Sequence, residues 1–323
     1  MGSKMTSAPL IAITGATGFI GRYLVRELTA RGCKVRILLR QPSSVPLDCS
    51  SAVIGDLARP KNTREAFDSA DAVIHTAGLS AAMTGVPEHD FRNLNTEATI
   101  GLARSAFAAG VRRFVFLSSV RAQAGPSAPS VLTEADAPQP TDPYGRSKLA
   151  AEQGLATLNG DWVALRLAST YGVGVSGNFA ELRRLAASRY PLPFAGLSAR
   201  RSILSLSNLL SAIEHVLKLT EPLRRPLLVA DPEPITTGEM IAAMRMGLGR
   251  RAGLFPVPAP ILKSAFAAAG RPEAYRRLAE PLVVRPDALH VLGWVAPLTT
   301  REGLARLMRA DGLEPASAGA RVG

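Results

Sequence analysis

The chain has little cysteine, few aromatic side chains and no long run of apolar residues. Its 323 residues include two cysteines, Cys33 and Cys49, and aromatic residues make up 5% of the total. Two cysteines cannot build a disulfide scaffold, and neither has a histidine at metal-ligand spacing, so we expect no metal site. Such a composition is typical of a reducing compartment, and we expect a cytoplasmic location. The apolar runs are too short to cross a bilayer and no secretory pattern is present, so we expect no membrane span.

Acidic residues are also scarce relative to basic ones. Lys and Arg number 38 against 26 for Asp and Glu, which gives a formal net charge of +12. The basic residues are scattered, without a block of five or six like charges, and they lack the interleaved aromatics of single-strand binders. The sequence therefore predicts no specific nucleic-acid partner, and an anionic small ligand or a solvated surface accounts for the charge.

What the first half does contain is a regular alternation of short apolar segments with segments of helical spacing. Such apolar segments are typical of parallel strands that helices cover on both faces. The sequence thus predicts an α/β fold with a doubly wound parallel sheet, of the Rossmann type. We expect strands at 10–14, 35–39, 52–54, 71–76, 113–117 and 162–167, and helices at 19–30, 61–69, 90–109 and 143–158.

The alternation of strand and helix patterns ends after about residue 171, where prolines cluster. Helical spacing is still visible at 179–188, 207–219, 237–248 and 299–309, and the segment 256–270 is typical of a helix packed beneath them. We expect a dinucleotide-binding Rossmann domain over residues 1–175 and a smaller, mostly helical substrate-binding portion over 176–323. The boundary is soft, and some later segments are expected to return to the Rossmann core.

The strongest local signal is a glycine-rich turn between the first strand and the first helix. In such a turn, Gly15 permits a tight bend, Gly18 lets the backbone approach a pyrophosphate, and Gly21 lets the helix pack against the strand. The helix N-terminus then directs free N–H groups at the anion. The sequence therefore predicts a dinucleotide site on the motif Thr14-Gly15-Ala16-Thr17-Gly18-Phe19-Ile20-Gly21.

The end of the second strand indicates which dinucleotide binds. An acid there, about 20 residues past the glycine turn, holds the ribose 2′-hydroxyl of NAD, whereas an arginine accommodates the 2′-phosphate of NADP. This chain has Arg40 at that point, and its next acid is Asp48. We therefore favour NADP(H), with NAD as the open alternative; Arg36 either supports Arg40 or faces solvent. After the third strand, Asp56 either caps a helix or accepts a hydrogen bond from the adenine amino group.

A second constellation comes from Tyr144-Gly145-Arg146-Ser147-Lys148. Positions i and i+4 lie on one face of a helix. A free phenol has a pKa of about 10, and a neighbouring ammonium favours the phenolate and so makes the tyrosine a usable proton donor or acceptor. Ser119 ends the fifth strand at the sheet edge where ligands bind, so its hydroxyl is placed to hold a substrate carbonyl towards Tyr144.

Together these motifs resemble the short-chain dehydrogenase/reductase superfamily, in its extended branch that modifies nucleotide sugars. The resemblance covers nearly the whole chain. It implies that Ser119, Tyr144 and Lys148 are catalytic, that Lys148 also binds the nicotinamide ribose, and that Asn95 supports the site. It extends the expected cofactor-binding set to Leu57, Ala77 and Gly78, and the further matching segments are His75-Thr76-Ala77-Gly78, Asn95-Thr96-Glu97-Ala98-Thr99 and Gly110-Val111-Arg112-Arg113-Phe114.

The C-terminal half contains the segments Gly177-Asn178-Phe179, Ala199-Arg200-Arg201-Ser202-Ile203-Leu204-Ser205 and Leu292-Gly293-Trp294. In these segments it resembles, within that branch, bacterial UDP-sugar 4-epimerases and 4-keto-sugar reductases. The resemblance implies that Asn178 and Arg201 contact the nucleotide diphosphate, for which an arginine fork is well suited. Many relatives pair two helices between subunits, which implies a homodimer. The chain departs from the pattern after the sixth strand, where the usual prolines are absent.

The motifs leave several functions open. A dehydratase needs an acid and a base beside the strand-end hydroxyl, but Ser119 is followed by Val120 and Arg121. Arg40 favours an exchangeable NADPH, and hence reduction of a 4-keto-6-deoxy UDP-sugar for surface polysaccharide synthesis. The first alternative is a UDP-glucose or UDP-N-acetylglucosamine 4-epimerase with tightly bound NAD. The second, of another class, is a catalytically silent regulatory protein that binds the cofactor.

Overall fold

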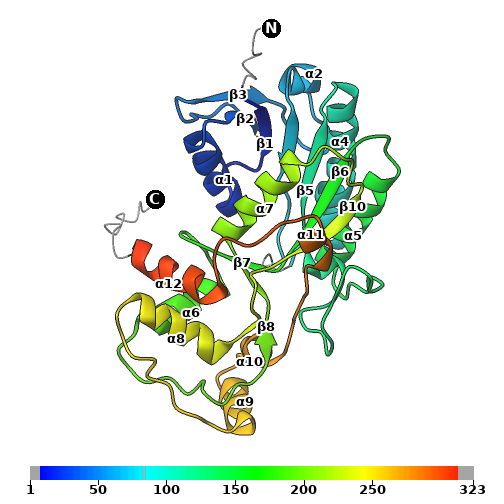
Figure 1. Cartoon of the computed structure of the whole chain (residues 1–323). Helices are drawn as coiled ribbons and strands as arrows, with labels where there is room; N and C mark the ends of the chain where they lie inside the picture. The colour runs from blue at the N-terminus through cyan, green and yellow to red at the C-terminus, as the bar shows by residue number, and fades with distance from the viewer. Residues whose placement is uncertain (1–7, 82, 84, 312–323) are drawn as a thin grey trace, which may run out of the picture.

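The centre of the fold is a parallel sheet with helices on both faces (Figure 1). This computed structural model describes residues 8–81, 83 and 85–311. Within them the main sheet is seven-stranded, and its neighbouring strands all pair in parallel, as the sequence predicts. In sheet order the strands are β10 (Arg225–Val229), β6 (Trp162–Leu167), β5 (Arg113–Ser119), β4 (Ala72–His75), β1 (Leu10–Thr14), β2 (Lys34–Leu39) and β3 (Cys49–Val53).

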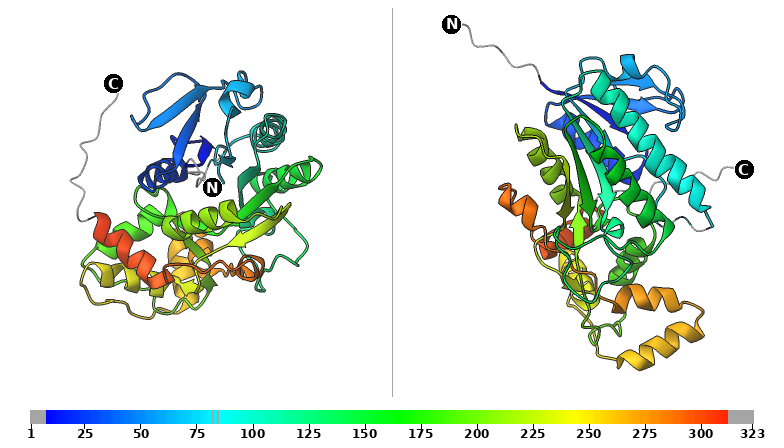
Figure 2. Two further views of the ribbon diagram at one scale, coloured as in Figure 1. Left: turned by 45° about the horizontal axis from the view of Figure 1, so that its top comes forward. Right: turned by 90° about the vertical axis from the view of Figure 1, so that its right-hand side faces the viewer.

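Each face of the sheet is covered by its own group of helices (Figure 2). The alternation of β1 shows why: Ile11 and Ile13 pack into one apolar cluster, and Ala12 packs into the other. Because these strands are buried on both faces, they read in the sequence as continuous apolar runs. The first face carries α1 (Phe19–Ala30) and α7 (Leu206–Lys218), and the second carries α2 (Thr63–Phe67), α4 (Ala98–Ala108) and α5 (Pro143–Ala156).

Helix α5 begins where its sequence predicts a helix start. Asp142 is the N-cap, and its carboxylate accepts a hydrogen bond from the backbone N of Gly145 at 2.7 Å. Pro143 occupies the first helical position, where a missing N–H costs nothing. These two residues fix the start of the helix that carries Tyr144 and Lys148.

Several expected elements have other bounds in the structure; the helix expected at 61–69, for example, is α2 (Thr63–Phe67). The third strand was expected at 52–54, but β3 spans Cys49–Val53, and its Ser50 and Ser51 are exposed. Because β3 is the edge strand of the sheet, its polar residues can face water and the strand has no long apolar run. The single helix expected over 90–109 is divided into α3 (Glu88–Phe91), the π-helical segment η1 (Arg92–Glu97) and α4.

The seventh strand lies in the second half of the chain. β10 pairs in parallel with β6 although it contains Pro226, and its position at the sheet edge tolerates a residue without an N–H. Helix α7 likewise returns to pack on α1. Segments after residue 176 therefore share the core of the sheet domain, while the expected boundary at 175/176 stays a prediction.

The rest of the second half packs around a third apolar cluster below the carboxyl ends of the strands (Figure 1). This portion, mostly helical as expected, faces the sheet edge at which the candidate site lies. Among the described residues, no helix is both long enough and apolar enough to cross a membrane. The remaining elements are η2 (Val120–Ala122), β7 (Ser169–Tyr171), α6 (Asn178–Ala187), β8 (Arg200–Arg201), β9 (Ile203–Ser205), β11 (Ile235–Thr236), α8 (Thr237–Gly247), α9 (Ala259–Ala268), α10 (Pro272–Ala279), α11 (Asp287–Val291) and α12 (Thr300–Asp311).

Candidate active site

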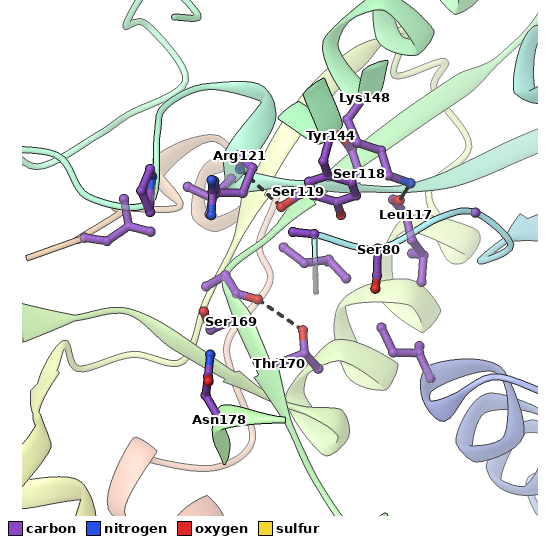
Figure 3. Close-up of a pocket in the computed structure, with 18 of the residues that line it drawn as sticks. Ser80, Leu117, Ser118, Ser119, Arg121, Tyr144, Lys148, Ser169, Thr170 and Asn178 are labelled. Carbon is purple, nitrogen blue, oxygen red and sulfur yellow. Dashed lines mark hydrogen bonds between the residues drawn. The ribbon is translucent and has the colours of Figure 1, made fainter. Parts of the chain in front are cut away.

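A cavity of about 600 Å³ lies between the sheet and the C-terminal portion (Figure 3). The end of β5 forms one wall, with Ser119 at its tip, and α5 adds Tyr144 and Lys148. Asn178 lies across the cavity from Tyr144 (Figure 3), and Arg201 also lines it. Ligands of doubly wound sheets bind at the carboxyl ends of the strands, where this cavity opens. The structure thus brings the three residues expected to be catalytic into one cavity with the two expected to bind substrate.

The hydroxyls of Tyr144 and Ser119 lie side by side at the cavity wall (Figure 3). Burial raises the pKa of the Tyr144 phenol, while its hydrogen bond with Ser119 and the nearby Arg121 cation lower it. The Ser119 hydroxyl also accepts a hydrogen bond from the backbone N of Arg121 at 3.1 Å. A substrate oxygen that enters here meets two hydroxyl groups at once, one of which is a weak acid.

Lys148 is buried beside them, with 5% of its surface exposed. Its Nζ donates a hydrogen bond to the carbonyl of Leu117 at 3.0 Å and lies 4.5 Å from the centre of the Phe116 ring and 5.9 Å from that of Tyr144. Burial lowers the pKa of Lys148 to about 8, against a smaller opposing effect of Glu152. Near neutral pH the ammonium is charged, and it lies close enough to the Tyr144 ring to favour a negative charge there.

Asn95 supports the site from the π-helical segment η1. It is fully buried, its Oδ1 accepts a hydrogen bond from the Leu79 backbone N at 2.8 Å, and its Nδ2 donates to Ser147 Oγ at 3.1 Å. A Cβ on Gly78 would lie 2.6 Å from Asn95 Oδ1 and 3.6 Å from Lys148 Nζ, so glycine is required there by close approach. Asn95 thereby joins the loop after β4 to the helix that carries Tyr144. π-helical turns are frequent at functional sites.

The glycine-rich turn has the geometry that its spacing predicts. Gly15 adopts a positive φ of +69°, and a Cβ there would lie 2.7 Å from the backbone N of Ala77. Gly18 donates a backbone hydrogen bond to the carbonyl of Gly15 at 2.9 Å. A Cβ on Gly21 would overlap that same carbonyl, so α1 can approach the turn only through glycine. The resulting cradle at the helix N-terminus fits the pyrophosphate of a dinucleotide.

A second cavity of about 240 Å³ adjoins this turn. It contains Gly15, Thr17, Arg40, Leu57 and Ala77, five of the residues expected to bind the cofactor. No aspartate or glutamate is among the described residues that line it, and Arg40 is its only charged lining residue within that part of the chain. Arg40 therefore lies beside the glycine turn, in the wall of the smaller cavity. Of the other expected cofactor residues, Ile20, Gly78, Tyr144 and Lys148 line the larger cavity, and Gly18, Phe19, Gly21, Asp56 and Asn95 line neither.

Two residues near the second and third strands have local partners. Arg36 neither supports Arg40 nor simply faces solvent: its Nη1 donates to the carbonyls of Glu65, Ala66 and Asp68 at the end of α2. A cation is favourable at a helix C-terminus, where carbonyls lack partners. Asp56 accepts a hydrogen bond from the backbone N of Ala58 at 3.0 Å and so caps the turn after β3.

Asn178 and Arg201 reach the cavity from different elements. Asn178 is the first residue of α6, and Arg201 lies in the short strand β8. Arg201 is oriented by two backbone carbonyls, those of Glu280 at 2.6 Å and Pro126 at 3.1 Å. Its pKa is lowered, chiefly by burial and next by the Arg121 cation. Because no carboxylate of the described residues forms an ion pair with it, its charge is available to an anion.

Several residues that line the larger cavity belong to none of the motifs found in the sequence. Arg277 and Glu273 come from α10, a helix that the sequence does not predict, and Ser169 and Thr170 follow β6. Arg121 is also in the cavity wall. Its position two residues past Ser119 is the one signal that could have found it, because residues just beyond a strand end face the ligand edge.

The fold and the paired Tyr144 and Lys148 beside a strand-end serine define an extended short-chain dehydrogenase/reductase. The family model described as NAD dependent epimerase/dehydratase family matches residues 11–226, and the chain belongs to that family. It is an enzyme of this NAD-dependent family. Within the described residues, no group of three metal-ligating side chains is positioned to hold a metal ion.

The comparisons extend over nearly the whole chain. A UDP-glucose 4-epimerase of Vibrio cholerae is 30% identical over 317 residues, covering 93% of this chain and 94% of the relative. The solved structure of MoeE5 in complex with UDP-glucose and NAD has a TM-score of 0.70 at 25% identity, covering 94% of this chain and 98% of that one. WbmG of Bordetella bronchiseptica in complex with NAD has a TM-score of 0.74 at 19% identity, with 96% of both chains covered, and shows the shared fold.

Proposed function

We propose that the protein catalyses oxidoreduction at C4 of a UDP-sugar, with Tyr144 as the group that gives or takes the proton. The observation that carries the proposal is the meeting of Ser119, Tyr144 and Lys148 on one wall of the large cavity. The match to a UDP-glucose 4-epimerase over nearly its full length supports the UDP-sugar as substrate class. An intact set of these three groups argues against a silent regulatory protein.

Each of the three groups has a distinct task in this mechanism. Ser119 hydrogen-bonds the oxygen on C4 and orients it towards Tyr144. The Tyr144 phenol donates its proton to that oxygen in reduction, and the Tyr144 phenolate accepts the proton from it in oxidation. The Lys148 ammonium stabilises the phenolate and would bind the ribose next to the reacting ring. When bound, the nicotinamide supplies the hydride for reduction or accepts it in oxidation.

The residues around the glycine turn fit a dinucleotide. The cradle of Gly15 and Gly18 would hold the pyrophosphate, and Thr17, Leu57 and Ala77 would enclose the adenosine in the smaller cavity. We propose NADP(H) as the preferred form, because Arg40 stands where an NAD-specific enzyme carries an acid. MoeE5 and WbmG are described in complex with NAD, so the preference rests on Arg40 alone.

On the other side of the cavity, Asn178 and Arg201 would bind the diphosphate of the UDP-sugar. Arg201 is already oriented by its two carbonyl contacts, so little side-chain entropy is lost when it binds an anion. Arg277 lines the same cavity and adds a second positive charge. The sugar then lies between this anion site and Tyr144, which brings C4 to the proton donor.

The direction of reaction follows from the cofactor. An NADPH that exchanges after each turnover suits a one-way reduction of a 4-keto-6-deoxy UDP-sugar, a reaction class of surface polysaccharide synthesis. A second candidate, 4-epimerisation of UDP-glucose or UDP-N-acetylglucosamine with tightly bound NAD, is favoured by the Vibrio cholerae relative. Both reactions use the same three residues. A homodimer stays a prediction.

The test offers the purified enzyme NADPH or NADH with UDP-4-keto-6-deoxy sugars, and separately UDP-glucose and UDP-N-acetylglucosamine without added cofactor. Consumption of NADPH with a 4-keto sugar supports reduction. Interconversion of the 4-epimers without net cofactor consumption supports the second candidate. If no UDP-sugar turns over in either assay, the proposal is wrong.

A further inference from the structure

Arg121 forms part of the cavity wall and has no task in the mechanism above. It lies in the short 3₁₀ turn η2, two residues past Ser119, and 23% of its side chain is exposed. An arginine inside a partly buried active-site wall is costly unless its charge and donors have partners. The partners of Arg121 indicate what it does.

Arg121 connects the strand-end serine to the start of the helix that carries Tyr144. Its backbone N donates to the hydroxyl of Ser119 at 3.1 Å (Figure 3). Its Nη2 donates to the carboxylate of Asp142, and the other oxygen of that carboxylate caps α5 at the backbone N of Gly145, 2.7 Å away. One carboxylate therefore holds both the arginine and the first turn of the helix.

The backbone packs closely at the same place. A Cβ on Gly145 would overlap the carbonyl oxygen of Arg121, so the turn after β5 lies directly against the first turn of α5. Gly145 follows Tyr144 in the chain. A change in the spacing between this turn and α5 would alter the distance between the hydroxyls of Ser119 and Tyr144.

The charged groups around the Tyr144 phenol come from two elements, η2 and α5 with its N-cap. Arg121 from η2 lowers the pKa of Tyr144, and Asp142, at the N-cap of α5, raises it. Lys148, one turn further along α5, has its Nζ 5.9 Å from the centre of the Tyr144 ring. Helix α3 contributes the uncharged ring of Phe91. In the same helix, Glu88 is paired with Arg146 of α5 at 2.8 Å.

Arg121 has a single carboxylate partner in the described part of the chain. That partner is Asp142, and the Nε–H of Arg121 is buried without an acceptor. Arg121 therefore adds a cation beside the phenol, in addition to Lys148.

We propose that Arg121 is a positioning residue for the reaction: its ion pair with Asp142 clamps the Ser119 turn against the helix of Tyr144 and holds a fixed positive charge next to the phenol. This inference rests on the proposed role of Tyr144 as proton donor and acceptor. It assigns no substrate contact to Arg121.

The test compares three variants, Arg121→Met, Arg121→Lys and Asp142→Asn. Asparagine is as good an N-cap as aspartate, so Asp142→Asn removes the anion while it keeps the helix start. Ionisation of the phenol is followed without substrate, as the phenolate ultraviolet absorbance of each protein minus that of the same protein with Tyr144→Phe. The rate kcat is then measured with the best UDP-sugar.

Opposite shifts of the phenol titration are expected. Arg121→Met removes the cation and moves the titration to higher pH, whereas Asp142→Asn removes the anion and moves it to lower pH. Arg121→Lys leaves it near that of the wild type. Because the clamp is lost, kcat falls by about a hundredfold in Arg121→Met, and Arg121→Lys restores most of this loss.

The proposal is overturned if the titrations of Arg121→Met and Asp142→Asn move in the same direction, or if Arg121→Met leaves the titration unmoved. It is also overturned if Arg121→Lys loses as much kcat as Arg121→Met. Absence of turnover with every UDP-sugar would contradict the proposed function instead. In that case the phenol titration still decides the role of Arg121.

Discussion

The buried ammonium of Lys148 donates a hydrogen bond to the carbonyl of Leu117, 3.0 Å away at the end of β5. The bond fixes the Lys148 side chain between α5 and the sheet without help from a ligand. It also places the positive charge at the strand end that carries Ser119. The charge to which we assign a role in the chemistry is therefore part of the folded protein.

Lys148→Met is expected to separate function from stability. Burial lowers the pKa of Lys148 to about 8, below the value of about 10.4 in an unfolded chain. As the pH rises, the folded state thus loses this proton before the unfolded state does. The buried ammonium therefore lowers the free energy of unfolding by its full amount below pH 8, and this loss disappears as the pH rises from about 8 towards about 10.4. At pH 7 the variant should lose about a hundredfold in kcat.

Thermal unfolding at pH 7 supplies the control for Lys148→Met. The variant removes a buried charge, so its melting temperature should equal or exceed that of the wild type. A variant that is both inactive and clearly less stable at pH 7 would show that Lys148 acts mainly by supporting the fold.

Arg40→Ala is expected to weaken NADPH binding by about 100-fold or more and NADH binding by much less, because a 2′-phosphate loses a charge-assisted partner. Titration of each nucleotide by calorimetry measures the two dissociation constants. Arg36→Ala is the matched control, since Arg36 is bound to the carbonyls at the end of α2 and should affect both nucleotides alike. Equal losses for NADPH and NADH in Arg40→Ala would remove the NADP assignment.

His75 is expected to make stability depend on pH. It is fully buried between Thr14 Oγ1 at 2.6 Å and Thr99 Oγ1 at 3.0 Å, and burial lowers its pKa to about 3. Between pH 6.5 and about 3, His75 is therefore protonated in the unfolded chain but not in the folded chain, so the free energy of unfolding falls as the pH falls. From pH 7 to 5 this contribution is about 2 kcal/mol.

His75→Gln isolates that contribution, because glutamine can hydrogen-bond both threonines and does not titrate. The free energy of unfolding in urea at pH 7 and pH 5 should fall more in the wild type than in the variant. The comparison is necessary because burial raises the pKa of Asp231 to about 6, which favours the folded state as the pH falls from 6 to 3.8. An identical pH dependence in both proteins would contradict a neutral buried His75.

The fold was predictable where a local sequence pattern determines the element. The bounds of β1 and β6 match the expected strands because both are buried and their apolar runs are continuous. Of the two edge strands, β3 was predicted with the wrong bounds because it carries exposed serines, and β10 was not predicted because it contains a proline. An edge position depends on the order of strands in space, which local spacing does not encode.

The candidate site was likewise predictable where its geometry is set within one segment, and not where it depends on contacts between distant segments. The spacing of Gly15, Gly18 and Gly21, and of Tyr144 and Lys148, is set within one turn or one helix face and was visible in the sequence. By contrast, Arg277 lines the cavity from a helix that is far from the other site residues in the chain. The ion pair between Arg121 and Asp142 likewise joins two separate segments. The bond of Asn95 to Ser147 depends on a π-helical segment for which the sequence carries no signal that we recognise.

The central claim is that Tyr144 moves the proton while hydride moves at C4 of a UDP-sugar. The most direct measurement follows turnover of a UDP-4-keto sugar with NADPH deuterated at the transferred position, by nuclear magnetic resonance, in the wild type and in Tyr144→Phe. The account predicts deuterium at C4 of the product and a loss of at least about a hundredfold in kcat in Tyr144→Phe, with NADPH binding retained. Full turnover by Tyr144→Phe, or deuterium at another carbon, would contradict it.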